Sequence, residues 1–391
     1  MGADAMQHRI RRELDALRDA SQFRTLECIT GVNLSSNDYL GLAEDPRLKQ
    51  GVAEAVQRAP AVGSTGSRLL SGNSPEWESL EENFAEFAGT EAALYFGSGY
   101  AANIGLLGSL LGPGDIVFSD AFNHASLIDG IRLSRATKTI YPHRDLRFLE
   151  NALRDHAGEP GARIIVTESI FSMEGDIAPI AELLQLARKY SAALLLDEAH
   201  ATGVCGPQGR GLAAQLDAQR EILAIVHTCG KALASAGAFV CGSRALKDYL
   251  VNRARTFIFS TAMPPYFAAQ IKAALDLARE ADDRRTHLRD ISATLRDKLA
   301  AAGLNIGTTA THIVPVIFGS NDSALHAASE LQRSGFAIRA IRPPTVPAGS
   351  ARIRISLTSK ITHDEVRRLI AVLSRSATGQ AAASPATAVH A

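Results

Sequence analysis

The pattern of apolar and polar positions divides the chain into regions with different expected structures. From about residue 79 to 260, short apolar runs such as RIIVTE (163–168) and AALLLDE (192–198) alternate with helical stretches. Strands that alternate with helices at this spacing are typical of a mostly parallel sheet covered on both faces. The pattern therefore predicts an α/β domain. In such sheets ligands collect at the carboxyl ends of the strands, so the residues after each run are the candidates for a site.

The flanking segments have other patterns. Residues 6–20 carry apolar side chains at helical spacing, which predicts a short amphipathic helix. After residue 265, long helices and short strands indicate a smaller α+β domain, whereas the last residues are mostly Ala, Thr and Ser without periodicity and are expected to be disordered. We therefore predict an N-terminal helix and arm over 1–35, a large domain over 36–265, a small domain over 266–375 and a disordered tail over 376–391.

Composition and charge narrow the class of protein. The 391 residues exceed one ordinary core and fit two or three domains of roughly 100–200 residues each. Lys plus Arg and Asp plus Glu both number 41, so no global charge favours nucleic acid or an anionic membrane. The sequence has neither a signal-peptide pattern nor an apolar run of about 18 residues that could span a bilayer. The four cysteines lack CxxC pairing and fit a reducing cytoplasm.

The segment AALLLDEAHATG delivers Asp197 at the end of a strand that reads as buried, with His200 just beyond it. A buried carboxylate needs a partner. Three interpretations remain open for Asp197: it caps a turn, it belongs to a metal pair, or it holds a cationic ring nitrogen of a cofactor. The letters DEAH also resemble a helicase box, but the phosphate loop GxxxxGK[ST] that a helicase needs does not occur, since Ala232 follows Lys231.

The segment ILAIVHTCGKALASAGAFV places Thr228 and Lys231 after another apolar run, among small residues that leave room for a planar ring. A half-buried lysine in this setting suits a depressed pKa and Schiff-base chemistry, although most lysines are surface charges. In FGSGYAANIG, glycines between a strand and a helix free backbone N–H groups to receive a phosphate. His124 stands at a loop-to-helix junction, where it could stack on a flat ligand or cap the helix.

Taken together, these segments resemble the α-oxoamine synthases, a branch of the fold-type-I pyridoxal-phosphate enzymes, from about residue 30 to 370. That resemblance implies a large domain with a mostly parallel seven-stranded sheet and a small α+β C-terminal domain. The blocks that carry it are NDYLGL (37–42), GSTGSRLLSGN (63–73), GSGYAAN (97–103), NHASLIDG (123–130), ESIFSMEGDIAP (168–179), DEAHATGVCGPQGRG (197–211), TCGKALASAGAF (228–239), FSTAMPP (259–265) and IRPPTVPAGSARIRISLT (341–358).

The resemblance implies pyridoxal 5'-phosphate as the cofactor and no metal. Lys231 matches the lysine that carries the cofactor, and Asp197 matches the partner of its pyridine nitrogen. Cys229 departs from the pattern, because family members commonly have an aromatic residue there. The remaining implied cofactor contacts are His124 stacked on the ring, His200 and Ser172 bonded to its phenolic oxygen, and Gly99, Tyr100 and Thr228 at its phosphate.

The same resemblance implies the substrates and the assembly. Arg354 with Asn37 is similar to the group that receives the amino-acid carboxylate, and Arg342 is a second candidate for such a contact. Ser260 and Thr261 are similar to a pair that reaches the cofactor phosphate of a neighbouring subunit, which implies a homodimer with a shared active site.

The implied reaction is condensation of a small amino acid with an acyl-CoA thioester and loss of carbon dioxide. The branch that joins L-alanine to pimeloyl-CoA (or a pimeloyl carrier protein) in biotin synthesis matches most closely. Sister activities that acylate glycine, including the one that forms 5-aminolevulinate, share the chemistry. An aminotransferase or aldolase would keep Lys231 and Asp197 without using CoA. A cofactor-binding regulatory protein is the non-enzymatic alternative, but the sequence has no helix-turn-helix region or basic arm.

Overall fold

The computed structural model describes residues 2–28 and 30–383, which form two compact units. The larger unit comprises residues 37–172 and 176–287. The smaller unit comprises the described parts of 1–36, 173–175 and 288–391.

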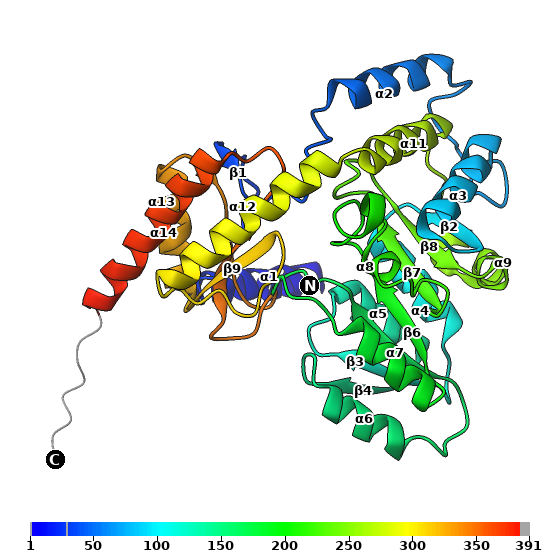
Figure 1. Ribbon diagram of the computed structural model, residues 1–391. Coiled ribbons are helices and arrows are strands. Elements are labelled where there is room, and N and C mark those ends of the chain that lie inside the picture. The colour runs from blue at the N-terminus through cyan, green and yellow to red at the C-terminus, as the bar shows by residue number, and fades with distance from the viewer. Residues whose placement is uncertain (1, 29, 384–391) are drawn as a thin grey trace. The chain divides into compact units, whose positions relative to one another are not determined.

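A seven-stranded sheet forms the centre of the larger unit (Figure 1). Strand β8 runs antiparallel to its neighbours β2 and β7, and the other neighbouring pairs are parallel. The predicted α/β fold with a mostly parallel sheet is confirmed. In their order across the sheet, the strands are β2 (Ala92–Phe96), β8 (Ala238–Gly242), β7 (Ala224–Thr228), β6 (Ala193–Asp197), β5 (Arg163–Glu168), β3 (Ile116–Asp120) and β4 (Thr137–Tyr141).

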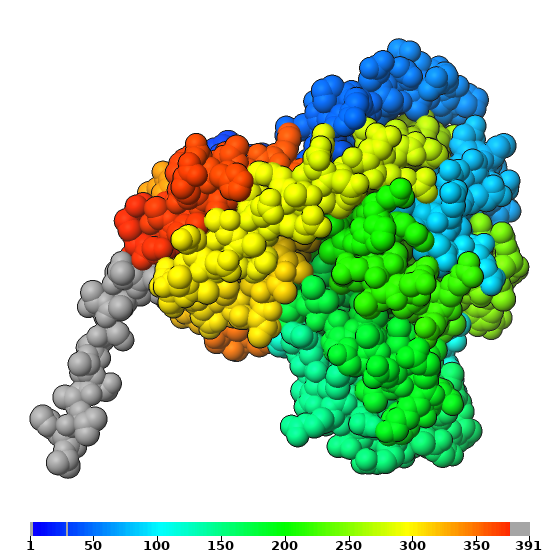
Figure 2. All heavy atoms as spheres, viewed as in Figure 1, coloured from blue at the N-terminus to red at the C-terminus, as the bar shows by residue number. Residues whose placement is uncertain are grey.

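The strands of the sheet centre read as continuous apolar runs because helices cover both of their faces. Val117, Val166, Leu195 and Val226 are buried in one hydrophobic cluster that also includes Leu106 of α4. Figures 1 and 2 show the molecule from the same side. In Figure 2, the side chains of the green segments, which include α7 and α8, cover the strands that are visible in Figure 1. The helices between the strands are α4 (Gly99–Leu110), α5 (Ala125–Ser134), α6 (Leu146–Asp155), α7 (Ile180–Lys189) and α8 (Leu212–Gln215), with a 3₁₀ turn η1 (Pro207–Gly209).

The register of the parallel strands brings the ends of several of them to one edge. Glu168, the last residue of β5, is paired with Asp197, the last residue of β6. Asp197 is paired in turn with Val226 of β7, two residues before the end of that strand at Thr228. Polar residues that are far apart in the sequence therefore share the carboxyl edge of the sheet.

The structure divides the chain after helix α11, whereas the sequence pattern predicted a domain boundary before it, at residue 265. Helix α11 packs against α2 and α3 and belongs to the larger unit, so the change of unit comes within α12, between His287 and Leu288. A continuous helix across the change hides the boundary from the sequence pattern. The remaining helices of the larger unit are α2 (Pro46–Arg58), α3 (Pro75–Ala88), α9 (Arg244–Arg253), α10 (Arg255–Ile258) and α11 (Pro265–Arg279), and α12 covers Asp282–Ala301.

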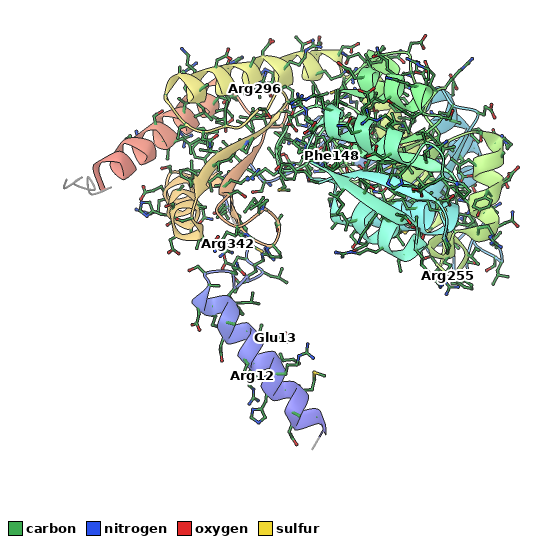
Figure 3. The ribbon with its side chains drawn as sticks, turned by 90° about the horizontal axis from the view of Figure 1, so that it is seen from below. Arg12, Glu13, Phe148, Arg255, Arg296 and Arg342 are labelled. Carbon is green, nitrogen blue, oxygen red and sulfur yellow. The ribbon has the colours of Figure 1, made fainter. Side chains whose placement is uncertain are left out.

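The smaller unit contains a three-stranded antiparallel sheet in the order β11-β12-β9 and a short parallel pair, β1 with β10. Helix α1 is exposed along nearly its whole length, including Arg12 and Glu13 (Figure 3). Helix α14 continues to Ala383, and the rest of the predicted tail, 384–391, lies outside the described residues. The elements are α1 (Gly2–Asp19), β1 (Val32–Asn33), β9 (Ile313–Gly319), α13 (Asn321–Arg333), β10 (Phe336–Ala337), β11 (Ala340–Ile341), β12 (Ala351–Ser356) and α14 (His363–Ala383).

Within the described residues, no helix is both long enough and apolar enough to cross a lipid bilayer.

Candidate active site

A cavity of about 370 Å³ lies at the carboxyl edge of the seven-stranded sheet. Strand ends of an α/β sheet are where ligands bind, because loops and helix N-termini converge there. The cavity is lined by Asn37, Gly97, Ser98, Gly99, Tyr100, Asn103, His124, Ser126, Glu168, Asp197, Ala199, His200, Thr228, Gly230, Lys231, Ser235, Ala236 and Gly237. It therefore gathers side chains from most of the sequence blocks of the larger unit into one place.

A second, larger cavity of about 850 Å³ lies at the opposite edge of the sheet, beside the first residue of β6, Ala193, and the last of antiparallel β8, Gly242. Its lining contains neither lysine nor histidine. Size alone does not identify a site, and the chemistry of the side chains favours the smaller cavity at the carboxyl edge.

Asp197 and Lys231 line the same cavity from adjacent strands of the sheet. Asp197 ends β6 and accepts hydrogen bonds from Asn103 Nδ2 (2.7 Å) and from the backbone N–H of Ala199 (2.9 Å). Lys231 follows β7 on a tight loop, in which Ala234 N–H donates to Lys231 O at 2.9 Å. An amine and a carboxylate thus meet in one pocket, as the sequence predicted.

The N-terminus of α4 forms one wall of the cavity. Ser98 caps the helix, its Oγ accepting from Ala101 N–H at 3.0 Å, while the N–H groups of Gly99 and Tyr100 precede the first intrahelical bonds. A Cβ on Gly99 would lie 2.8 Å from Cγ2 of Thr228, so glycine permits this close approach. The exposed N–H groups and the positive end of the helix dipole make this wall suitable for a phosphate.

His124 both caps α5 and lines the cavity, so the two interpretations of this residue are compatible. Its Nδ1 lies 2.8 Å from Ser126 Oγ and accepts from Ser126 N–H at 3.3 Å. Burial lowers the pKa of His124, and Lys231 lowers it further, while the Asp197 carboxylate opposes both effects. His124 is therefore favoured as the neutral imidazole near pH 7.

His200 contacts Tyr39, which the sequence did not predict as part of the site. Its Nδ1 lies 2.5 Å from the hydroxyl of Tyr39, which lies 3.0 Å from Asn37 Oδ1. Tyr39 falls within the NDYLGL block, but the identity of its partner depends on how that loop folds over the strand ends. Asn103 and Ser126 were missed for the same reason, since their contacts depend on the packing of α4 against α5.

The other predicted site residues lie outside this cavity. Ser172 is buried in the loop after β5 and does not line it. Ser260 and Thr261 line a smaller cavity of about 240 Å³ that shares Gly97 and Ser98 with it. Their roles remain predictions.

The two predicted substrate arginines belong to the smaller unit. Arg354 is buried in β12. Arg342 (Figure 3) lines a cavity of about 670 Å³ with Arg18, Arg24 and Arg339 and donates to the carbonyl oxygen of Ser21. Burial and the nearby Arg24 lower the pKa of Arg342, which nevertheless stays cationic at neutral pH. A cavity with this many arginines suits an anionic group.

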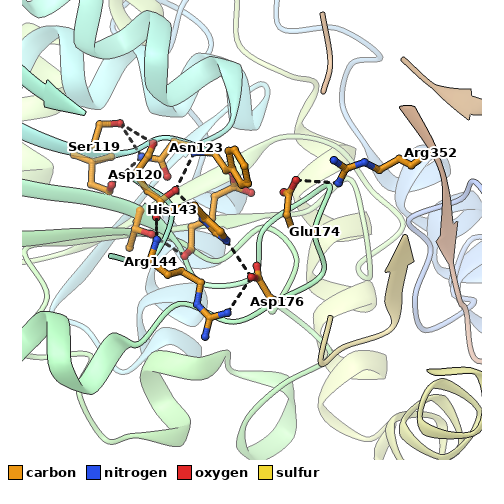
Figure 4. A network of polar contacts seen from close by, with 12 residues as sticks. Ser119, Asp120, Asn123, His143, Arg144, Glu174, Asp176 and Arg352 are labelled. Carbon is orange, nitrogen blue, oxygen red and sulfur yellow. Dashed lines mark hydrogen bonds and ion pairs between the residues drawn. The ribbon is translucent and has the colours of Figure 1, made fainter. Parts of the chain in front are cut away.

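A charged network surrounds His143 in the larger unit (Figure 4). His143 lies between Asp120 and Asp176, with Nδ1–Oδ1 and Nε2–Oδ2 distances of 2.9 and 3.0 Å. Burial lowers the pKa of His143, but the hydrogen bonds to both carboxylates outweigh it and raise the pKa to about 9. In the same loop as Asp176, Glu174 pairs with Arg352 at 3.0 Å within the smaller unit.

The side chains that line the cavity at the carboxyl edge fit pyridoxal 5'-phosphate. Lys231 is an amine that can carry the aldehyde, Asp197 is a carboxylate that can accept from a protonated ring nitrogen, and the first turn of α4 can hold the phosphate. Because Gly99 has no side chain, nothing fills the space between that turn and Thr228. The donor set thus matches the different ends of this cofactor.

Comparisons with known proteins show the family to which the chain belongs. The model of the family "Aminotransferase class I and II" matches residues 29–373. A protein of Geobacter sulfurreducens named 8-amino-7-oxononanoate synthase is 44% identical over 387 residues, covering 95% of this chain and 98% of the relative.

Solved structures show the same architecture. A structure described as SPT with PLP has a TM-score of 0.84 and 29% identity and covers 90% of this chain and 89% of its own. The 8-amino-7-oxononanoate synthase of Francisella tularensis has a TM-score of 0.79 and 27% identity and covers 90% and 99%.

Fold and site together define a fold-type-I pyridoxal-phosphate-dependent transferase. The chain belongs to the aminotransferase class I and II family, whose members related to it over most of its length include proteins named 8-amino-7-oxononanoate synthase. The family predicted from the sequence blocks is confirmed.

Proposed function

We propose that this enzyme condenses L-alanine with a pimeloyl thioester to give 8-amino-7-oxononanoate, free thiol and carbon dioxide, as a step of biotin synthesis. The observation that carries the proposal is the meeting of Lys231 and Asp197 in one cavity at the carboxyl edge of the sheet. Identity of 44% to a protein with this name over nearly the whole chain supports the choice of acyl and amino-acid substrates.

Each residue of the cavity has a role that its chemistry can supply. Bound pyridoxal 5'-phosphate withdraws the electron pair left when a bond to Cα of the amino acid breaks. Lys231 would carry the cofactor and, once the amino group of alanine has displaced it, its free amine would take the proton from Cα of alanine. Asp197 holds the proton on the ring nitrogen, which stabilises the negative charge that develops in the transition state. The electron pair attacks the thioester carbonyl, the thiolate leaves, and the carboxyl group departs as carbon dioxide.

The remaining predicted residues bind and orient. Gly99, Tyr100 and Thr228 hold the phosphate, His124 covers one face of the ring, and His200 bonds its phenolic oxygen. Ser172 is a second candidate for that bond. Asn37, Arg354 and Arg342 are proposed to receive carboxylates of the substrates, since a guanidinium fork matches a carboxylate.

A homodimer is proposed through the surface that carries Ser260 and Thr261. Leu69, Leu70 and Phe259 are 49, 84 and 70% exposed, respectively. They lie on two segments joined by a Ser67–Thr261 bridge. Neighbouring apolar side chains at such exposure mark interaction surfaces. Sedimentation velocity should show a dimer, and Leu70→Asp should produce inactive monomer, whereas Leu216→Asp, at another exposed leucine, should stay dimeric. An active wild-type monomer would remove the shared-site role of Ser260 and Thr261.

A cytoplasmic location also stays a proposal. None of the four cysteines forms a disulfide in the structure, which suits a reducing compartment. Fractionation of cells that produce the full-length protein should place it with cytoplasmic markers.

Thiol release tests the proposed reaction. The enzyme with bound cofactor is given L-alanine, glycine or L-serine, each with acyl-CoAs of several chain lengths, and free thiol and product mass are measured. L-Alanine with pimeloyl-CoA should react fastest and yield the mass of 8-amino-7-oxononanoate. Lys231→Ala should abolish the reaction, while Lys189→Ala, at an exposed lysine paired with Glu150, should not. Preference for glycine or serine would assign a sister activity, and turnover without thiol release would indicate an aminotransferase.

A further inference from the structure

Asn103 connects the two sides of the cavity through a continuous chain of hydrogen bonds. It lies on α4, is 1% exposed and lines the cavity. Its Nδ2 lies 2.7 Å from Asp197 Oδ2 and 2.9 Å from Ser126 Oγ. Ser126 Oγ lies 2.8 Å from Nδ1 of His124. The chain therefore runs from Asp197 through Asn103 and Ser126 to His124.

The direction of the first bonds follows from the carboxylate. An Asn amide has two N–H groups on its nitrogen and none on its oxygen. If the amide were turned, its oxygen would face the Asp197 oxygen at the same short distance, and two acceptors would repel each other. Asn103 Nδ2 must therefore face Asp197, and its second hydrogen is then directed to Ser126 Oγ.

The direction of the last bond fixes the proton on His124. Because Ser126 Oγ accepts from Asn103, its own hydrogen is free to be donated to His124 Nδ1. The backbone N–H of Ser126 also points at this atom, at 3.3 Å. With two donors facing it, Nδ1 acts as an acceptor, so the ring proton must reside on Nε2. The charged groups that influence His124 are Asp197 and Lys231, and the Tyr100 ring packs edge-on at 6.3 Å.

We propose that Asn103 and Ser126 are positioning residues, Asn103 orienting the Asp197 carboxylate and Ser126 holding His124 as the neutral tautomer protonated on Nε2. The part that concerns the cofactor rests on the proposed function. A neutral imidazole over the ring adds no positive charge that would oppose protonation of the ring nitrogen, while an oriented carboxylate favours that protonation. One buried amide thus connects the groups on both sides of the cavity.

Nitrogen chemical shifts of His124 test the tautomer directly. The full-length protein is labelled with ¹⁵N-histidine, and His124 is assigned among the 11 histidines by its loss in His124→Gln. Spectra are recorded near pH 7 with and without pyridoxal 5'-phosphate. Nε2 should show the protonated shift and Nδ1 the unprotonated shift. A cationic ring or an Nδ1-protonated ring would overturn the proposal.

The variants separate positioning from general structure. Ser126→Ala should shift His124 toward a mixture of tautomers, whereas Ser134→Ala should not, although Ser134 is also a buried serine of α5. Unchanged His124 shifts in Ser126→Ala would contradict the role of this hydroxyl. Because these spectra can be read without cofactor, they stand even if the proposed reaction is wrong.

Cofactor affinity tests the role of Asn103. Asn103→Leu, close in size but without donors, should weaken pyridoxal 5'-phosphate binding by about 10- to 150-fold, the range for a hydrogen bond to a charged group. Asn83→Leu is the control, because that amide bonds within its own helix at Ser79 O. Thermal unfolding without cofactor checks that each variant folds. A folded Asn103→Leu protein that binds the cofactor within twofold of wild type would overturn this role.

Discussion

The close approach of Gly99 to Thr228 gives a sharp test of the phosphate wall. In Gly99→Ala, the new Cβ would lie 2.8 Å from Cγ2 of Thr228. Carbon atoms pack at about 3.5–4.0 Å. The contact would therefore be short by about 0.7 Å or more, and the first turn of α4 or the end of β7 would have to move. Overpacking of this kind typically costs about 1–3 kcal/mol.

If the strain is relieved by moving the first turn of α4, its N–H groups no longer point at the cofactor phosphate. We expect Gly99→Ala to raise the dissociation constant of pyridoxal 5'-phosphate by about 5- to 150-fold, which corresponds to the same energy range. The assay is a titration of cofactor-free protein with pyridoxal 5'-phosphate, followed by the absorbance of the bound cofactor.

Thr228→Ser supplies the matched control, because it removes Cγ2 and keeps the hydroxyl. Cβ of Thr228, the next atom along, lies at 3.9 Å from the added carbon, which is an ordinary contact. Gly99→Ala should therefore weaken binding far less in the Thr228→Ser background than in the wild-type one. Equal losses in the two backgrounds would refute the steric reasoning.

Three further substitutions test other parts of the account. With pyridoxal 5'-phosphate at saturating concentration, Asp197→Asn should lower kcat by about 10²- to 10³-fold, as for other groups that stabilise transition-state charge, and near-normal turnover would count against its role. The pKa of His143 is raised to about 9. Its protonated ring therefore stabilises the fold fully below about pH 6.5, the ordinary pKa of histidine, and progressively less as the pH rises through 9. The melting temperature gap between wild type and His143→Gln should thus shrink from pH 6 to 10, and a constant gap would contradict this. Glu81→Ala should lower the free energy of urea unfolding by about 3–5 kcal/mol, since buried Glu81 pairs with Arg68 and Lys247 at 2.9 and 2.7 Å, and a loss under about 1 kcal/mol would argue against a buried network.

The sequence predicted the residues that follow from strand geometry. Asp197 and Thr228 end strands of a parallel sheet, and Lys231 follows closely, so the pattern of apolar runs was enough to place them at one edge. The parallel register then brings them together without further information. This is the part of the site that depends on local periodicity alone.

The contacts between helices could not be read in the same way. Asn103 reaches both Asp197 and Ser126 because α4 packs against α5 above the strand ends. An asparagine in an Ala-rich helix carries no signal of that role in its own sequence. The predicted boundary at residue 265 differs from the division in the structure for a related reason. Helix α11 belongs to the larger unit because it packs against α2 and α3, and its own sequence does not show that packing.

The proposed chemistry depends most on Lys231 as the residue that carries the cofactor. Reduction of the enzyme with borohydride in the presence of pyridoxal 5'-phosphate, followed by peptide mass spectrometry, locates the lysine to which the cofactor is attached. We expect one pyridoxyl-modified peptide, with the added mass on Lys231, and no such peptide in Lys231→Ala. Modification of a different lysine, with Lys231 left unmodified, would contradict it.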